Sequence, residues 1–216
     1  MVKLVPPAPA RLLHSAAVVL LACLWLAMML LGRGPLDRSV YEALYAGHRP
    51  AFALAARVAT MLGDPTVLVG AGFLVAAWLW YRRRGRFAIG LLLVILVGRG
   101  LSEVQKYWIA RPRPALETHL VVVKTWSFPS GHATSSMIFY LTVALALTAN
   151  GARRRILAGA AILLSLLIGL SRVMLGVHWP SDVIGGWAFG LLWVLVTLRP
   201  AERLFAGNSR RSPKQL

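Results

Sequence analysis

The chain has 216 residues, of which 58% are hydrophobic and only 14% are charged. A soluble domain usually carries about 25% charged and roughly 45–50% apolar residues, so this composition, with a mean hydropathy of +0.67, argues against an ordinary soluble protein. The formal net charge of +17 is compatible with binding to nucleic acid, to a membrane surface or to an anionic substrate. Because the basic residues lie mostly in short segments between long apolar runs, we expect a membrane protein that does not bind nucleic acid.

Six apolar runs are close to the length of about 20 residues with which a helix crosses a bilayer. We place the predicted spans at 12–31, 65–81, 87–105, 132–149, 156–175 and 181–198. Asp64 and Pro65 open the second span, because aspartate is a good N-cap and proline fits the first helical position. The first run resembles a signal peptide, but it is longer than an h-region of about 7–15 apolar residues, so we expect a transmembrane helix.

The segment 36–62 has a mixed composition, with apolar residues at helical spacing and arginines between them. This pattern predicts an amphipathic helix on the membrane surface. The basic, polar segment 200–216 is expected to be a frayed cytoplasmic tail. No repeat or linker divides the chain, so we treat 1–216 as one domain with a membrane core over about residues 60–198.

The distribution of basic residues predicts the orientation, because Lys and Arg concentrate in short cytoplasmic segments. More of the Lys and Arg residues lie near the two ends of the chain and in the clusters 82–86 and 153–155 than in the segments 33–57 and 106–131. We therefore expect a protein of the cytoplasmic (inner) membrane with both termini cytoplasmic. The polar loop 106–131 should then face the periplasm or the exterior.

Three polar segments flank the spans, and the predicted topology brings all of them to the outer end of the bundle. They are Lys106 with Arg113-Pro114 after six intervening residues; Pro129-Ser130-Gly131-His132; and Ser171-Arg172 followed by His178 and Asp182. This pattern resembles the signature of the type 2 phosphatidic acid phosphatase superfamily, K-x6-RP, PSGH and SR-x5-H-x3-D, at every position.

The resemblance covers about residues 60–198 and implies an all-α, polytopic membrane helix bundle with about six transmembrane helices. It places the active site at the outer end of that bundle. It also implies an enzyme that hydrolyses lipid phosphates through a phosphohistidine intermediate.

The charges in these motifs suit phosphoryl transfer, which depends on positioning and on electrostatic stabilisation of the phosphate oxygens. Lys106, Arg113 and Arg172 supply positive charge, and an arginine can bind two oxygens at once. Ser130 and Gly131 lie at a helix N-terminus, where backbone N–H groups bind anions and glycine permits close approach. With three cations and no dense carboxylate cluster for magnesium, we expect neither a metal nor a cofactor.

The two histidines are predicted to have different roles. If the sixth span starts near Pro180, Asp182 can bind one ring nitrogen of His178, fix its tautomer and leave the other nitrogen as nucleophile. His132 is then available to protonate the leaving group and to activate water. Glu103, one turn before Lys106, either orients that lysine or forms a simple salt bridge at the helix end.

We expect the substrate to be a membrane lipid phosphate or diphosphate, and undecaprenyl diphosphate is the first choice because the chain is compact and has no added domain. Phosphatidylglycerophosphate, phosphatidic acid and lipid A phosphates stay open, as does a phosphotransferase that passes the phosphate to another lipid. A vanadate haloperoxidase is disfavoured by the short, apolar chain, and a non-catalytic binder by the presence of both histidines. The expected partners are this substrate and membrane lipids, and the oligomeric state stays open.

Overall fold

The structure is a computed structural model that describes residues 8–148 and 151–206. All regular structure in this part of the chain is helical. The helices are α1 (Ala8–Leu31), α2 (Pro35–Leu44), α3 (Pro50–Met61), α4 (Pro65–Tyr81), α5 (Gly85–Ile109), α6 (Gly131–Leu147), α7 (Ala152–Met174) and α8 (Pro180–Ala206). Five candidate membrane spans, with α3 and α4 counted as one, are accompanied by the shorter apolar helix α6. The predicted all-α membrane bundle is confirmed.

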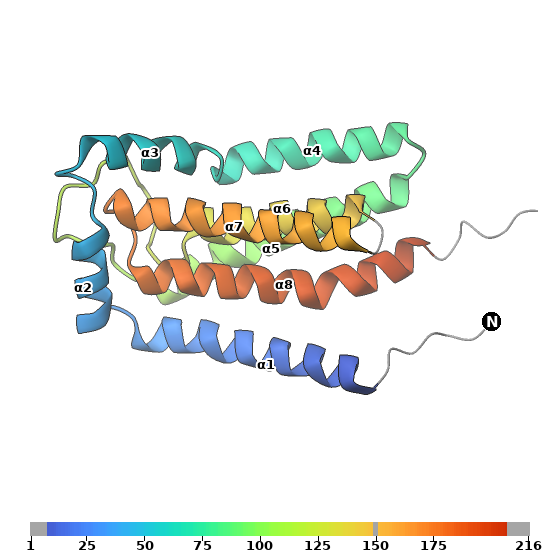
Figure 1. The fold of residues 1–216 in the computed structure, drawn as a ribbon, viewed down its shortest axis with the longest axis horizontal. Helices are drawn as coiled ribbons and strands as arrows, with labels where there is room; N and C mark the ends of the chain where they lie inside the picture. The colour runs from blue at the N-terminus through green and yellow to red at the C-terminus, as the bar shows by residue number, and fades with distance from the viewer. Residues whose placement is uncertain (1–7, 149–150, 207–216) are drawn as a thin grey trace, which may run out of the picture.

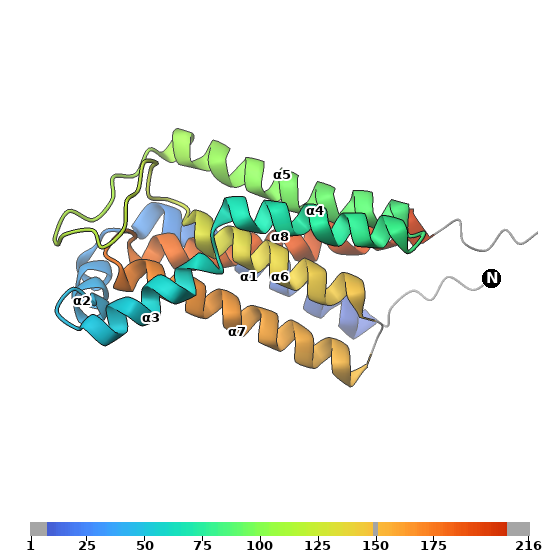
Figure 2. The same cartoon turned by 90° about the horizontal axis from the view of Figure 1, so that it is seen from above.

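The long helices run side by side along one axis, and α2 lies across one end of them (Figure 1; Figure 2). Helix α6 is central, because it packs against α4, α5, α7 and α8, whereas α1 packs on α8. The end that carries α2 also carries the loop 110–130, and we call it the loop end (Figure 1). The arginines of 82–86 and 153–155 lie at the opposite end, where α4 meets α5 and where α7 begins.

The boundaries of the spans follow from local chemistry. Asp64 caps α4 as expected, since its carboxylate accepts hydrogen bonds from the N–H groups of Thr66 (2.8 Å) and Val67 (3.1 Å). Pro65 occupies the first turn of that helix. At its other end, α5 stops at Ala110, which adopts a left-handed conformation with φ of 44°.

Two segments differ from the sequence prediction. The single amphipathic helix expected over 36–62 is divided into α2, which crosses the loop end, and α3, which packs beside α7. The break precedes Pro50, which cannot donate the backbone hydrogen bond that a continuing helix needs. Residues 200–206 of the predicted tail continue α8, and residues 207–216 lie outside the described residues, as does Lys3.

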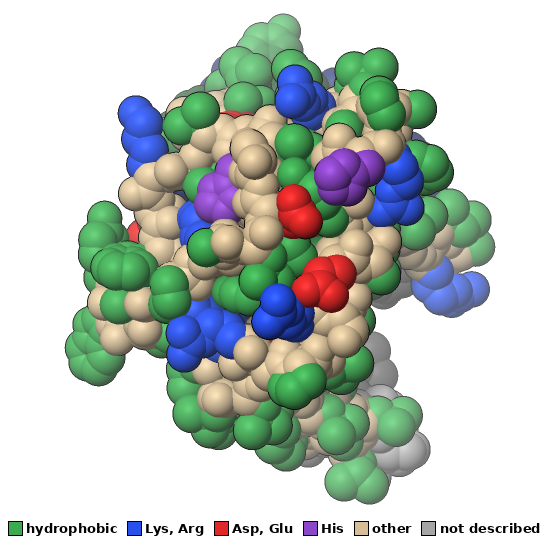
Figure 3. Space-filling view, turned by 90° about the vertical axis from the view of Figure 1, so that its left-hand side faces the viewer, with side chains coloured by type: hydrophobic (Ala, Val, Ile, Leu, Met, Phe, Trp, Pro, Cys, Tyr) green, Lys and Arg blue, Asp and Glu red, His purple; other side chains and the backbone are tan. Residues whose placement is uncertain are grey.

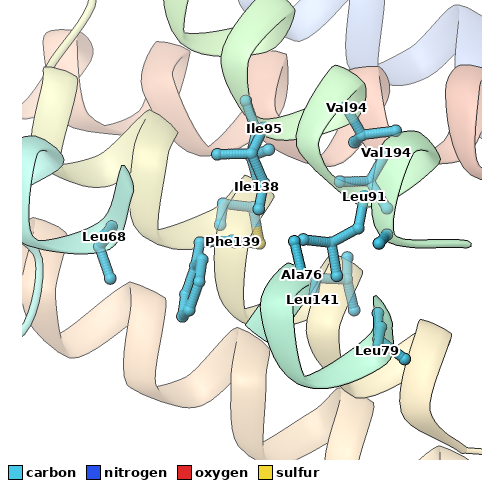
Figure 4. Close-up of a cluster of buried hydrophobic side chains, with 12 residues drawn as sticks. Leu68, Ala76, Leu79, Leu91, Val94, Ile95, Ile138, Phe139, Leu141 and Val194 are labelled. Carbon is cyan, nitrogen blue, oxygen red and sulfur yellow. The ribbon is translucent and has the colours of Figure 1, made fainter. Parts of the chain in front are cut away.

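The main apolar core is a cluster of buried side chains between the long helices (Figure 4). Helices α4, α5, α6 and α8 contribute its buried side chains, among them Leu79, Leu91, Ile138 and Val194. The helices approach closely where glycines face large side chains. Gly169 of α7 is buried against the indole of Trp187, whose Nε1 donates to the Ser165 carbonyl at 2.9 Å.

We predict that Gly169→Ala destabilises the protein, because an added Cβ would lie 2.4 Å from the Trp187 ring. Overpacking of this kind costs about 1–3 kcal/mol, which exceeds the gain of up to about 1 kcal/mol from replacing a helical glycine by alanine. The matched control is Gly159→Ala in the same helix, where nothing lies within 4 Å of the added Cβ. Thermal unfolding in detergent should show a lower midpoint for Gly169→Ala alone; equal midpoints for the two variants would contradict this packing.

Candidate active site

Charged side chains and histidines gather on the face of the loop end, whereas apolar side chains project from its rim (Figure 3). A cavity of about 200 Å³ opens among them. Its lining includes six of the predicted site residues: Lys106, Arg113, Gly131, His132, Arg172 and His178. The other two, Ser130 and Asp182, are fully buried beside it. The structure therefore brings the three separate motifs together around one cavity.

His178 lies between α7 and α8 with its two ring nitrogens in different surroundings. Its Nε2 lies 3.2 Å from Nη1 of Arg113, while Nδ1 lies 3.5 Å from Oδ2 of Asp182 and 3.4 Å from Oγ of Ser127. A guanidinium can only donate, so Nε2 must carry the lone pair and Nδ1 the proton. This is the tautomer that leaves the lone pair on the nitrogen beside Arg113, as the predicted role of a nucleophile requires.

The surroundings of His178 also favour its neutral form. The side chain is 1% exposed. Burial, followed by the positive charges of Arg113 and Arg172, holds its pKa well below the usual 6.5. Arg113 stays a cation at neutral pH, because burial lowers its pKa only to about 10. A neutral imidazole beside a permanent cation is the combination that nucleophilic attack on a phosphate requires.

Both carboxylate oxygens of Asp182 are hydrogen-bonded. Its Oδ1 accepts from Nη1 of Arg111 at 2.8 Å, and its Oδ2 accepts from the backbone N–H of Trp179 at 2.9 Å and from the Ser127 hydroxyl. The carboxylate is 0% exposed, so these bonds replace the water that it loses. Asp182 can therefore stay ionised and fixed beside His178.

Arg111 supports this carboxylate, and sequence reasoning gave it no role. Its Nη2 donates to the carbonyls of Met28 (2.8 Å) and Met29 (2.6 Å) in the last turn of α1, and its guanidinium lies 4.4 Å from the centre of the Phe128 ring. The motif contains two arginines followed by proline, Arg111 and Arg113, and the K-x6-RP spacing selects Arg113. The structure assigns Arg113 to the cavity and Arg111 to Asp182.

Asp37 of α2 was likewise missed, because its segment reads as an amphipathic surface helix. Its Oδ1 accepts from the Ser181 N–H at 2.8 Å, and its Oδ2 accepts from the Ser181 hydroxyl and, at 2.7 Å, from the N–H of Arg33. A carboxylate at this place satisfies an unpaired donor in the first turn of α8. Helix α2 thereby fixes the turn that carries His178 and Asp182.

Lys106 reaches the cavity from the last turn of α5. Its Nζ lies 3.1 Å from Oε1 of Glu103, the weaker candidate from the sequence, which is thus placed to orient it. A Cβ added at Gly131 would lie 3.0 Å from the same Nζ. The absence of a side chain at position 131 therefore lets the lysine approach the N-terminus of α6, where backbone N–H groups face the cavity.

Arg172 comes from α7 and is 5% exposed. Its Nη1 donates to the Thr60 hydroxyl of α3 at 2.8 Å, which sequence reasoning also missed, while its buried Nε has no hydrogen-bond partner in the described chain. The Ser130 hydroxyl is another buried group without a partner there. Unsatisfied buried polar groups are costly, so both are candidates for binding a ligand oxygen.

His132 lies in the first turn of α6 and lines the same cavity as His178. No hydrogen bond from its ring to another described residue is found, which leaves the imidazole available to a ligand or to water. In residues 8–148 and 151–206, no cluster of three His, Cys, Asp or Glu side chains could hold a metal ion. The positive charges that line the cavity come from Lys and Arg.

Comparison with known proteins agrees with this arrangement. A sequence model of the PAP2 superfamily matches residues 87–205. The chain belongs to the PAP2 superfamily. Phosphatidylglycerophosphatase B of Bacillus subtilis is 34% identical over 137 residues, which cover 62% of this chain and 67% of that protein. An undecaprenyl-diphosphatase of Sulfolobus acidocaldarius is 35% identical over 120 residues, which cover 53% of this chain and 55% of that protein.

A solved structure gives the same fold. The transmembrane PAP2 type phosphatidylglycerolphosphate phosphatase from Bacillus subtilis superposes with a TM-score of 0.76 at 26% identity, over 91% of this chain and 99% of that one. The predicted family, the membrane helix bundle and the enzyme class, a hydrolase of lipid phosphates, are confirmed. The roles of the individual site residues stay predictions.

We predict that His178 is a neutral imidazole with its proton on Nδ1, and that it remains neutral below pH 6.5 because its pKa is lowered. NMR spectra of protein labelled with ¹⁵N-histidine, in detergent and phosphate-free buffer, report both the tautomer and the charge. The signal is assigned by its loss in His178→Gln. Half-protonation at or above pH 6.5, or a proton on Nε2, would show that Arg113 and burial do not control this ring as described.

Proposed function

We propose that this protein removes a phosphate group from a membrane lipid phosphate or diphosphate through a phosphohistidine intermediate. The observation that carries the proposal is the convergence of Lys106, Arg113 and Arg172 with two histidines on one cavity at the end of a membrane helix bundle. Three cations bind a phosphate, one histidine attacks it, and the other serves the leaving group.

In the first step the phosphate oxygens accept hydrogen bonds from the three cations and from the N-terminus of α6. Nε2 of His178 attacks phosphorus, and the bond from that phosphorus to the oxygen of the leaving group breaks. From a lipid monophosphate the leaving group is an alkoxide, which His132 protonates, and from a lipid diphosphate it is the lipid monophosphate, which needs this proton less. The imidazole becomes positively charged as the N–P bond forms, and the carboxylate of Asp182 beside Nδ1 stabilises that charge. Arg113, whose Nη1 lies 3.2 Å from Nε2, binds a phosphate oxygen beside the line of attack and so positions phosphorus in front of the nucleophile.

In the second step His132 takes a proton from water, and the resulting hydroxide attacks the phosphohistidine. The N–P bond breaks, inorganic phosphate leaves, and the neutral imidazole of His178 is restored. No metal or cofactor takes part in this scheme. If a second lipid hydroxyl replaced water, the same site would act as a phosphotransferase, which is the alternative outcome.

For the lipid, undecaprenyl diphosphate is our first choice. It is supported by the relative named undecaprenyl-diphosphatase and by a putative undecaprenyl-diphosphatase of Escherichia coli, YbjG, that is 32% identical over 127 residues. Phosphatidylglycerophosphate and phosphatidic acid are the alternatives, and the relative and the solved structure from Bacillus subtilis favour the first of them.

We further propose that the loop end faces the periplasm or the exterior and that both termini lie in the cytoplasm. The arginine clusters at 82–86 and 153–155 support this orientation, because they lie at the opposite end of the bundle.

We expect His178→Ala to abolish the phosphoenzyme with every substrate, because the attacking atom is lost. His132→Ala should slow alkyl lipid phosphates by about 10²–10⁴-fold, the usual contribution of a general acid. It should slow aryl phosphates much less, because their leaving group needs no proton. Rapid-quench trapping with ³²P-labelled substrates, in buffer that contains EDTA, measures both effects and separates free phosphate from phosphate transferred to lipid.

Asp182→Asn is the control in that experiment, since it removes the charge beside Nδ1 and keeps Nε2. It should form phosphoenzyme slowly rather than not at all. Labelled phosphoenzyme that persists in His178→Ala and disappears in His132→Ala would reverse the two roles. Activity that requires added magnesium would contradict the scheme with side-chain cations alone.

The orientation is tested by cysteine labelling after Cys23 is replaced by alanine. A cysteine at the exposed Thr118 of the loop end should react with an impermeant reagent from outside the cytoplasmic membrane. A cysteine at Ala152, exposed at the opposite end, is the matched control and should react only after that membrane is permeabilised. The reverse pattern would place the site in the cytoplasm.

A further inference from the structure

Besides the three cations of the mechanism, Arg99 and Lys124 also line the cavity, and Arg99 is the one that comes from a membrane-spanning helix. It lies in α5 four residues before Glu103 and seven before Lys106, so all three share one face of the helix. Arg99 lines the cavity that also contains His178, His132 and Arg172. It also lines a smaller pocket of about 10 Å³ between α4, α5 and α6, where its neighbours are Leu68, Ile95 and Ile138.

The position of Arg99 is deeper in the bundle than that of Lys106. Seven residues of α-helix rise by about 10 Å. The loop end lies at the C-terminal end of α5, so Arg99 lies on the side of the cavity toward the middle of the bundle. A lipid whose terminal phosphate is bound near His178 must extend its chain from the loop end toward the membrane interior. The part of the substrate that follows the reacting phosphate therefore passes Arg99.

The guanidinium of Arg99 is not paired within the described chain. Its Nη1 is buried and has no hydrogen-bond partner there. The nearest carboxylate in the sequence, that of Glu103, forms its ion pair with Lys106 instead. An arginine in a membrane-spanning helix is expensive, and unpaired buried donors add to the cost. A group from the substrate can supply the missing acceptor.

We propose that Arg99 binds a second phosphate of the substrate, located between the phosphate that His178 attacks and the lipid chain. This inference rests on the proposed function and deepens it. Phosphate is the group that suits a planar guanidinium with unpaired donors, since it accepts two hydrogen bonds at once. A lipid with one phosphate presents only its chain or its glycerol at this place. Arg99 is therefore a specificity residue for lipids that carry two phosphates in series.

The test compares two substrates that share one chain, farnesyl diphosphate and farnesyl monophosphate, in the full-length protein. In Arg99→Gln, kcat/KM for phosphate release from the diphosphate should fall about 10-fold to 100-fold, the range expected for hydrogen bonds to a charged group. The value for the monophosphate should change less than about 3-fold. Arg99→Lys, which keeps the charge but not the two-pronged geometry, should lie between wild type and Arg99→Gln for the diphosphate alone.

Arg82→Gln is the matched control, because it removes the same charge from an exposed position at the opposite end of the bundle. Arg82→Gln should leave kcat/KM unchanged for both substrates. A second pair of substrates is phosphatidylglycerophosphate, whose two phosphates are separated by a glycerol, and phosphatidic acid, which has one phosphate. This pair tests whether Arg99 can also bind a second phosphate that is not joined directly to the first. A loss confined to phosphatidylglycerophosphate would support the inference with the glycerol-spaced phosphate as the ligand.

Binding is measured in parallel with farnesyl methylenediphosphonate and farnesyl phosphonate, which are not hydrolysed. Wild type should prefer the diphosphonate, and Arg99→Gln should lose that preference. Equal losses for one-phosphate and two-phosphate ligands, or no loss for either, would overturn the role of Arg99. A wild-type protein that binds the diphosphonate through Arg99 but releases phosphate from no lipid would refute the proposed hydrolysis and leave the Arg99 subsite intact.

Discussion

The burial of the Asp182 carboxylate is the constraint on which the loop end depends. An ionised carboxylate with 0% exposure is tolerable only if its oxygens are fully paired. Its partners come from two segments: Arg111 and Ser127 of the loop 110–130, and the backbone of Trp179 before α8. Satisfying this one group therefore positions both the loop and the turn that carries His178.

A second feature lowers the stability of the fold, because the cavity concentrates positive charge. Lys106, Arg113 and Arg172 surround it, and within the described chain only Glu103 forms an ion pair with any of them. The repulsion is part of the reason that His178 stays neutral. Such a site is less stable empty than occupied, so an anion that binds there stabilises the fold as well as the complex. The positive charge that phosphate binding requires therefore lowers the stability of the folded protein without a bound anion.

The predicted spans correspond to helices of the structure, five candidate spans and the shorter apolar helix α6, because apolar length and the Asp64 cap are local signals. The eight site residues could be named because their spacing matches a family signature. Arg111, Asp37, Thr60 and Ser127 could not, because each acts through a contact that spans many residues of chain. A carboxylate in an amphipathic segment, such as Asp37, has the same local pattern whether it faces water or caps a distant helix. Tertiary packing alone decides between the two.

Helix α1 lies before the segment that the family model matches, yet it contacts a residue of that segment. Recognition by sequence starts at residue 87, and every signature position lies after it. Yet Arg111 depends on the Met28 and Met29 carbonyls, and Arg172 on Thr60. A fragment that started at residue 87 would keep every signature position. It would lose the oxygen atoms that accept hydrogen bonds from Arg111 and Arg172. The segment 87–205 that the family model matches therefore depends on α1 and α3, which lie before it, for the positions of Arg111 and Arg172.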